Sequence, residues 1–342
     1  MDNLRGLLED LIKVPGVSGY EDPIRSHIRS LVEAYGRVYE DNVGNLVLDL
    51  GGEGETILLA AHMDELGLVV THIEEDGMVR FRKIGGIDDR ILPNSRVTVH
   101  TEKGEVPGVI GITPPHLQLD RGDQRVVAWH ELGIDVGAES REDAEAMGIR
   151  VLDPVTLDKN IAWLGGGRTI AARAIDDRSG CAVLVELARA VGEGEVKPRG
   201  RLLLAWTVQE EVGLRGAMAL AETIRPGLFI AVDTMSCCLP GITGSARLGG
   251  GPVIRAVDNA YIAERKLVSR IESLARNRGI DYQVATAGGG TDAGALQRRG
   301  VRAIALGIPV KYSHSSVEVM RLRDLEAMVD LAKALAEDPP IG

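Results

Sequence analysis

The stretch Arg201–Leu214, RLLLAWTVQEEVGL, joins a run of apolar residues to two adjacent glutamates, Glu210 and Glu211. An apolar run this short is typical of a strand that is buried on both faces of a sheet. Two like charges at the end of such a strand cost stability, because the strand would turn one of them toward the interior without a partner. The pair therefore needs a functional explanation as well as a place in the fold.

Similar apolar runs recur along the chain and alternate with helical patterns. The runs are 45–50, 56–62, 227–233 and 301–307, and the helical patterns are 178–192, 214–224 and 263–279, with two further helices in the first 35 residues. Alternation of this kind indicates a doubly wound α/β sheet flanked by helices.

The pattern of apolar and polar residues changes between residues 67 and 165. Short alternating segments such as 78–84, 95–101 and 105–112 are separated by turn signals, and one short helix follows Ser140, a natural N-cap. We expect a small β-rich domain inserted into a discontinuous catalytic domain, with the chain divided into 1–66, 67–165 and 166–342.

Composition excludes several classes of protein. The 342 residues are 44% hydrophobic and carry a net charge of -11 without a run of like charges, which argues against nucleic acid and membrane surfaces as partners. No stretch reaches the roughly 18 apolar residues that cross a bilayer, and the acidic amino terminus is unlike a signal peptide, so we expect a cytoplasmic protein. Cys181, Cys237 and Cys238 fit neither a disulfide framework nor a zinc motif, and we expect buried thiols.

Acidic and histidine residues follow almost every apolar run. Because ligands gather beyond the carboxyl ends of parallel strands, these residues are candidates for one shared site. The candidates are His62, Asp64, Asp176, Asp177, Glu210, Glu211, Asp233 and His314. Each has an ordinary explanation when taken alone, since an Asp can cap a helix or a turn and a histidine can be a core or a solvated residue.

The combination is harder to explain by coincidence. Two imidazoles and several carboxylates, with no thiolate, suit two divalent first-row metal ions. Zinc fits best, with cobalt or manganese as alternatives, and one carboxylate would bridge the two ions.

Five motifs in this order carry a resemblance to a known family. They are AHMDELG (61–67), AIDDRSG (174–180), QEEVG (209–213), AVDT (231–234) and YSHSS (312–316), and PPHLQL (114–119), IDVGAES (134–140) and GGGTDAGAL (288–296) are further similar segments. The chain resembles the M42 family of dinuclear metallo-aminopeptidases, the TET and glutamyl aminopeptidase group. The resemblance implies a zinc-peptidase fold with an inserted dimerisation domain, and a homo-oligomer, a dodecamer built from dimers, that acts on short peptides.

The resemblance also implies roles for single residues. Asp176 would bridge the ions, His62 and Asp233 would complete one of them, and Glu211 and His314 the other. Glu210 would be the general base and acid, Asp64 would orient His62, and the Asp176–Asp177 peptide would be cis. The loop after Asp233 would border the substrate pocket together with Thr291 and Asp292.

Metal-dependent removal of amino-terminal residues is therefore the predicted activity. The loop after Asp233 is uncharged as far as Arg247, which favours substrates with neutral or hydrophobic first residues. Two alternatives remain open, a related dinuclear amidohydrolase or carboxypeptidase and a peptide-binding shell without catalysis. An endoglucanase activity has little support, since aromatic residues make up only 3% of the chain and offer no sugar-stacking platform.

Overall fold

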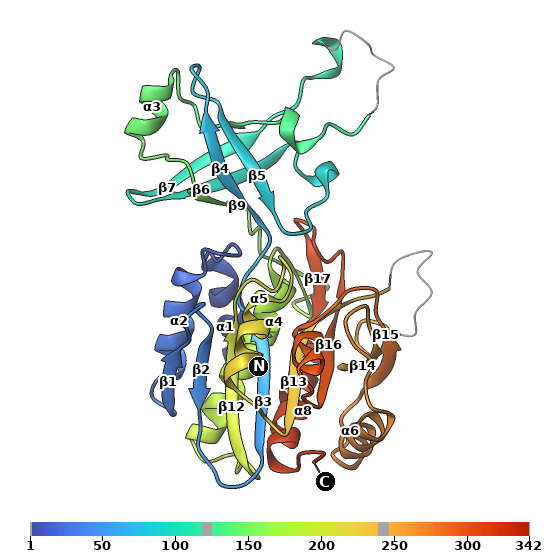
Figure 1. Ribbon diagram of the computed structural model, residues 1–342. Coiled ribbons are helices and arrows are strands. Elements are labelled where there is room, and N and C mark those ends of the chain that lie inside the picture. The colour runs from blue at the N-terminus through green and yellow to red at the C-terminus, as the bar shows by residue number, and fades with distance from the viewer. Residues whose placement is uncertain (1, 118–124, 239–245, 342) are drawn as a thin grey trace.

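The computed structural model describes residues 2–117, 125–238 and 246–341, and these form two domains. Figure 1 shows an α/β domain with both chain ends and, above it, a β-barrel. The chain enters the barrel after strand β3 and returns before strand β10, so the barrel is an insertion in the α/β domain.

The described part of the α/β domain is built on an 11-stranded mixed sheet with the order β1-β2-β12-β3-β13-β16-β17-β11-β10, in which β14 joins β16 and β15 joins β14. Strands β12, β3, β13 and β16 are neighbours and run parallel. The strands are β1 (Arg37–Glu40), β2 (Leu46–Asp49), β3 (Thr56–His62), β10 (Ala162–Leu164), β11 (Thr169–Ala172), β12 (Arg201–Thr207), β13 (Leu228–Ser236), β14 (Val253–Val257), β15 (Gln283–Thr286), β16 (Ala303–Lys311) and β17 (Glu318–Arg321). The predicted fold class is confirmed.

Helices cover both faces of this sheet, which explains why its central strands are apolar throughout. In β3, Ile57 and Leu59 pack into one core, whereas Leu58 and Ala60 pack into the other. The first core is closed by α1 (Asp2–Lys13), α2 (Asp22–Val32), α4 (Ile175–Gly192), α6 (Arg265–Asn277) and α8 (Leu322–Glu337), and the second by α5 (Arg215–Thr223) and α7 (Asp292–Arg298).

The inserted domain is a closed barrel of six strands in the order β4-β5-β8-β7-β6-β9, with its own apolar core. The Ser140 hydroxyl accepts a hydrogen bond from the Asp143 N–H at 3.2 Å, which confirms the predicted N-cap. The elements of this domain are β4 (Gly67–Ile73), β5 (Val79–Ile84), β6 (Ser95–Thr101), β7 (Gly104–Ile110), β8 (Ile134–Asp135), β9 (Pro154–Leu157), α3 (Arg141–Ala146) and the 3-10 turns η1 (Asp89–Ile91), η2 (Pro115–Leu117) and η3 (Trp129–Glu131). The large sheet resumes at β10, a few residues before position 165.

A buried carboxylate, Glu65, lies where the chain crosses between the domains. It accepts hydrogen bonds from Lys159 Nζ at 2.6 Å and from the Gly16 N–H at 3.1 Å, and it lies 3.5 Å from Arg178 Nη2. Burial lowers the pKa of Lys159 to about 8, although the Glu65 carboxylate opposes this shift. Because Glu65 and Lys159 belong to opposite crossings, this ion pair fixes both crossings to each other and to the α/β domain.

The cysteines differ in part from expectation. Cys181 is a buried free thiol, as predicted. Cys237 and Cys238 form a disulfide with each other, so the expectation of free thiols is wrong for this pair. Because they are consecutive, their Cα atoms lie only 3.8 Å apart whatever the fold, a case that spacing rules for distant cysteines do not cover.

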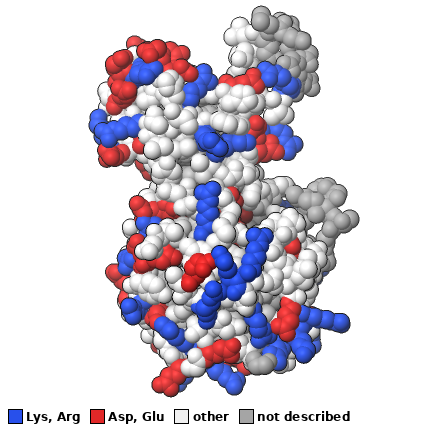
Figure 2. All heavy atoms as spheres, viewed as in Figure 1, with Lys and Arg blue, Asp and Glu red and all other residues white. Residues whose placement is uncertain are grey.

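Charged side chains of both signs are spread over the molecule. Figure 2 shows Lys and Arg side chains close to Asp and Glu side chains on both domains of the face in view. Such mixing weakens the long-range field of either sign. Among the described residues, no helix combines the length and the apolar character needed to span a membrane.

Candidate metal centre

The parallel strands bring the candidate residues to one edge of the sheet. His62 is the last residue of β3, Glu210 and Glu211 follow β12, Asp233 lies in the second half of β13, and His314 follows β16. The start of α4 adds Asp176 and Asp177, whose backbone angles are not helical. The peptide between these two aspartates is cis, as predicted. Adjacent parallel strands thus gather residues that are far apart in sequence.

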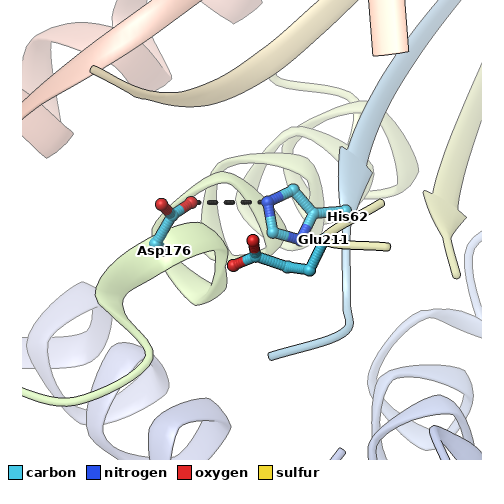
Figure 3. Close-up of side chains that lie close together, drawn as sticks. All are labelled: His62, Asp176 and Glu211. Atoms are coloured by element: carbon cyan, nitrogen blue, oxygen red, sulfur yellow. Dashed lines mark ion pairs between the residues drawn. The ribbon is translucent and has the colours of Figure 1, made fainter. Parts of the chain in front are cut away.

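Asp176 lies between the two histidines. Its Oδ1 is 3.3 Å from His62 Nε2, and its Oδ2 is 3.6 Å from His314 Nε2. Glu211 Oε2 lies 3.4 Å from the same His314 nitrogen. Figure 3 shows His62, Asp176 and Glu211 pointing toward one another. One carboxylate therefore faces both imidazoles, as a bridging ligand would.

Two groups of ligand atoms are close enough to hold metal ions. One comprises His62, Asp176 and Glu211, the other His62, Asp177 and Asp233, and the atoms within each group lie within 4.8 Å of one another. Asp176 Oδ1 and Asp177 Oδ2 are buried and have no hydrogen-bond partner. Unpaired buried carboxylate oxygens are costly unless a cation neutralises them, so the donor set fits divalent ions. Asp177 is among the candidates from the sequence, but the resemblance gives it no ligand role.

The electrostatics agree with a site built for positive charge. Burial raises the pKa of Glu211 well above its usual range, and the Asp176 carboxylate adds to this shift. Burial and the charge of Asp176 also raise the pKa of Asp233 to about 6. Burial likewise opposes ionisation of Asp176, but the neighbouring His62 imidazole lowers the pKa of Asp176 below its usual range. Several carboxylates thus compete for few counter-charges, and bound cations would relieve this competition.

Asp64 is fully buried and organises the residues around it. Its Oδ1 lies 3.5 Å from His62 Nδ1, which is consistent with the predicted orienting role. The same carboxylate accepts hydrogen bonds from the Glu210 N–H at 2.9 Å, the Glu211 N–H at 3.2 Å and the Ser18 hydroxyl at 2.6 Å. Asp64 therefore also fixes the backbone of the two glutamates, a contact that the sequence did not predict.

Left-handed backbone conformations surround the site. Gln209 (φ 53°) precedes the glutamates, Leu214 (φ 57°) follows them, and Tyr312 (φ 59°) and His314 (φ 62°) belong to the histidine loop. Residues with side chains rarely adopt such angles, and they cluster where surrounding contacts enforce a functional geometry. The loops that carry Glu210, Glu211 and His314 are therefore held in defined conformations.

A cavity of about 360 Å³ opens in front of these residues. Besides the candidate ligands and Glu210, its lining includes Leu214, Met235, Gly288–Gly290 and Arg255. The Arg255 guanidinium donates to the carbonyls of Thr234 at 3.1 Å and Gly289 at 3.2 Å. Apart from the candidate ligands and Glu210, the described wall is therefore neutral except for Arg255, whose guanidinium already has partners.

Thr291 and Asp292 are buried behind this cavity. Asp292 Oδ2 accepts a hydrogen bond from the Thr207 hydroxyl at 2.6 Å, and the Thr291 hydroxyl lies 3.3 Å from Asp258 Oδ2. The neighbouring glycines 288–290 line the cavity, whereas these two side chains are not part of its lining. Thr291 and Asp292 could therefore affect substrate binding only indirectly, by positioning glycines 288–290. Of the loop expected to border the pocket, residues 239–245 lie outside the described part of the chain.

The barrel domain reaches this centre through Gly85 and Gly86. A Cβ atom on Gly86 would lie 3.3 Å from His314 Nδ1, and one on Gly85 would lie 3.4 Å from the Glu211 carbonyl oxygen. The inserted domain thus packs directly against two of the candidate residues.

Glu21 is a buried carboxyl group that contacts the loop carrying Glu210 and Glu211. Its titration should make the free energy of unfolding depend on pH. Its Oε1 accepts hydrogen bonds from the N–H groups of Gly19 at 2.7 Å and Gln209 at 3.1 Å, and burial raises its pKa from 4.5 to about 7. The folded state then binds this proton more tightly than the unfolded state. The free energy of unfolding should therefore fall as pH rises from 4.5 to 7.

Glu21→Gln keeps the acceptor oxygen for both N–H donors and removes the titration. We expect the variant to unfold like the wild type below pH 4.5 and to gain up to about 3 kcal/mol above pH 7. Urea unfolding at a series of pH values measures the difference between the two proteins. Parallel curves over the whole range would contradict this prediction.

Comparison with known proteins agrees with the geometry. Residues 44–331 match the family model of the M42 glutamyl aminopeptidases. The lysyl aminopeptidase of Pyrococcus furiosus is 37% identical, with 97% of this chain and 96% of the relative aligned. The glutamyl aminopeptidase of Lactococcus lactis subsp. cremoris is 30% identical, with 92% and 90% aligned.

A solved structure of the Pyrococcus horikoshii TET1 peptidase is also similar. It is 45% identical, the alignment covers 98% of this chain and 99% of the other, and the TM-score is 0.92. That peptidase can assemble into a tetrahedron or a large octahedral shell. The family match and the similarity over the whole fold confirm the resemblance seen in the sequence motifs, and the chain belongs to the M42 family of aminopeptidases.

Proposed function

We propose that this protein is a dinuclear metal-dependent aminopeptidase that removes the first residue of short peptides. The observation that carries the proposal is Asp176, whose two carboxylate oxygens face His62 and His314 on opposite sides. Zinc is the ion that best suits these nitrogen and oxygen ligands, with cobalt or manganese as alternatives.

The ligands would divide between two ions, with Asp176 placed to contact both. His62 and Asp233 would hold one ion, with Asp177 within reach of the same atoms, and Glu211 and His314 would hold the other. When bound, such ions polarise a substrate carbonyl and lower the pKa of a coordinated water.

Glu210 is the residue proposed to move the proton. Its side chain lines the cavity, and its Oε2 lies 4.0 Å from His62 Nε2, yet it belongs to neither group of ligand atoms. Burial raises the pKa of Glu210 well above its usual range, which suits a group that must accept a proton and then release it. Glu210 would take a proton from the attacking water and return it to the leaving amine.

A free amino terminus is the feature expected to define the substrate. The carboxylates at the cavity can attract a protonated amine and so direct cleavage to the first peptide bond. We expect aminoacyl anilides with a free amine to be cleaved in the presence of zinc or cobalt, and not after chelation. Cleavage of N-acetylated peptides alone would instead indicate the amidohydrolase alternative.

The cavity wall favours neutral or hydrophobic first residues. The uncharged part of this wall includes Leu214, Met235 and Gly288–Gly290. The charge of the buried Arg255 is balanced by Asp233 at 3.8 Å and Asp258 at 3.6 Å. A panel of aminoacyl anilides tests this preference, and leucyl or alanyl substrates should be cleaved fastest. Fastest cleavage of acidic residues would overturn the preference and point to Arg255 as the selecting group.

We also infer that the protein forms a closed homo-oligomer, a dodecamer built from dimers, with the barrel as the dimerisation domain. The tetrahedral and octahedral assemblies of the similar TET1 peptidase support a closed homo-oligomer. Such a shell would admit only short or unfolded peptides. Multi-angle light scattering on the full chain measures the mass directly, and a monomer would contradict the inference. The division of the chain at residues 67 and 165 and the cytoplasmic location stay predictions.

A further inference from the structure

A buried glutamate outside the predicted site connects two of its proposed ligands. Glu318 begins β17 and is 3% exposed. Its Oε2 accepts a hydrogen bond from the Asp176 N–H at 3.1 Å, and its Oε1 accepts one from the His314 N–H at 3.0 Å. Both oxygens of one carboxylate are thus engaged by the backbones of two residues that would hold metal ions.

One other hydrogen bond joins these two segments, from the Ser313 hydroxyl to Asp176 Oδ2 at 3.0 Å, but it does not engage the His314 backbone. Asp176 lies at the start of α4, whereas His314 lies in a loop between β16 and β17 with a left-handed φ of 62°. The His314 side chain is 44% exposed, so packing alone holds its ring weakly. A buried N–H group that loses its acceptor is costly, and one Glu318 side chain satisfies the N–H groups of both residues. Glu318 is therefore a principal constraint on where His314 lies relative to Asp176.

The two proposed ligand sets differ in how their positions are fixed. His62 and Asp233 lie on adjacent central strands, and Asp64 provides a separate contact for the His62 ring. The other half depends on Glu211, from a loop, and on His314. A loss of Glu318 should consequently affect the second half more than the first.

We propose that Glu318 is a positioning residue that sets the affinity of the metal site formed by Glu211 and His314. The proposal rests on the dinuclear function proposed above. Residues that orient metal ligands commonly change metal affinity by about 10- to 100-fold when they are substituted. We expect an effect of this size on the ion held by Glu211 and His314, and a smaller effect on the other ion, which shares only Asp176 with it.

Asp324 offers a matched control. It is a fully buried carboxylate in the first turn of α8, and its oxygens accept hydrogen bonds from the N–H groups of Gly249 at 2.6 Å and Gly251 at 2.9 Å. Like Glu318, it is a buried carboxyl group that accepts hydrogen bonds from two backbone N–H groups, but neither glycine lines the cavity at the metal centre. Substitution of Asp324 therefore reports the general cost of losing a buried carboxylate between two N–H donors.

The experiment is a cobalt titration of the metal-free full-length protein by calorimetry, with metal content per chain measured by elemental analysis. The wild type and Asp324→Ala should bind two ions with the same affinities. Glu318→Ala should bind one ion about 10- to 100-fold more weakly than the wild type and the other ion with a clearly smaller loss. Glu318→Gln keeps one acceptor oxygen, so its affinity for the weakened ion should lie between those of the wild type and Glu318→Ala. If circular dichroism shows that Glu318→Ala does not fold, the Gln variant tests the proposal.

Three results would overturn the proposal. They are wild-type affinity for both ions in the Glu318 variants, an equal loss at both sites, or the same loss in Asp324→Ala. A wild-type protein that binds fewer than two ions would instead contradict the dinuclear function, so the two failures are distinguishable.

Discussion

Glu210→Gln is expected to lower kcat/KM by about 10²- to 10⁴-fold while both metal ions stay bound. The amide has nearly the shape of the carboxylate but cannot accept a proton. The backbone of Glu210 is held by Asp64 through its N–H group at 2.9 Å, so the loop should keep its place in the variant. Steady-state rates on an aminoacyl anilide, measured with zinc or cobalt present, give the size of the loss.

The control for this variant is its metal content. Because Glu210 is in neither group of ligand atoms, elemental analysis should find the same number of ions per chain as in the wild type. An unchanged kcat/KM would remove Glu210 from the mechanism. A loss of metal together with activity would make it a ligand rather than a base.

Glu211→Ala is expected to lose one of the two ions and, with it, nearly all activity. Glu211 Oε2 lies 3.4 Å from His314 Nε2 and belongs to the ligand group that includes Asp176. Removing it leaves one half of the centre with His314 and a shared carboxylate, too few ligands to hold an ion firmly. Dialysis against a low concentration of zinc, followed by elemental analysis, should find about one ion per chain.

His314→Ala serves as the matched variant, because it removes the other ligand of the same ion. The two variants should lose the same ion and resemble each other in metal content. Retention of two ions by Glu211→Ala would show that the division between the adjacent glutamates is incorrect. The pair Glu210 and Glu211 is thus separated by two measurements, one of rate and one of metal content.

Much of this fold could be predicted from apolar patterning. The run 56–62 is buried on alternate sides by two layers of helices, and a strand with no polar face requires this arrangement. The rule that ligands lie beyond the carboxyl ends of parallel strands then placed His62, Glu211 and Asp233 at one edge, and the structure brings them there.

Contacts made by residues outside the motifs could not be predicted in this way. Glu318 lies four positions after His314, between Val317 and Val319, and no local signal marks a glutamate that turns inward and accepts two backbone N–H groups. The sequence placed the segment of Thr291 and Asp292 near the cavity, but not the direction of those side chains. Direction depends on tertiary packing that local pattern does not encode.

The closeness of Gly86 to His314 limits whether the barrel domain can be removed from this enzyme or exchanged. The barrel looks like a separable module, with its own core and two crossings to the rest of the chain. Yet its β5–η1 loop lies against the ligand cluster, where even a methyl group on Gly86 would lie 3.3 Å from the His314 imidazole. A minimal catalytic domain made by cutting out the barrel would leave His314 without its neighbour on that side. The module therefore belongs to the catalytic unit, and a graft of another family member's barrel would have to bring a matching glycine pair with it.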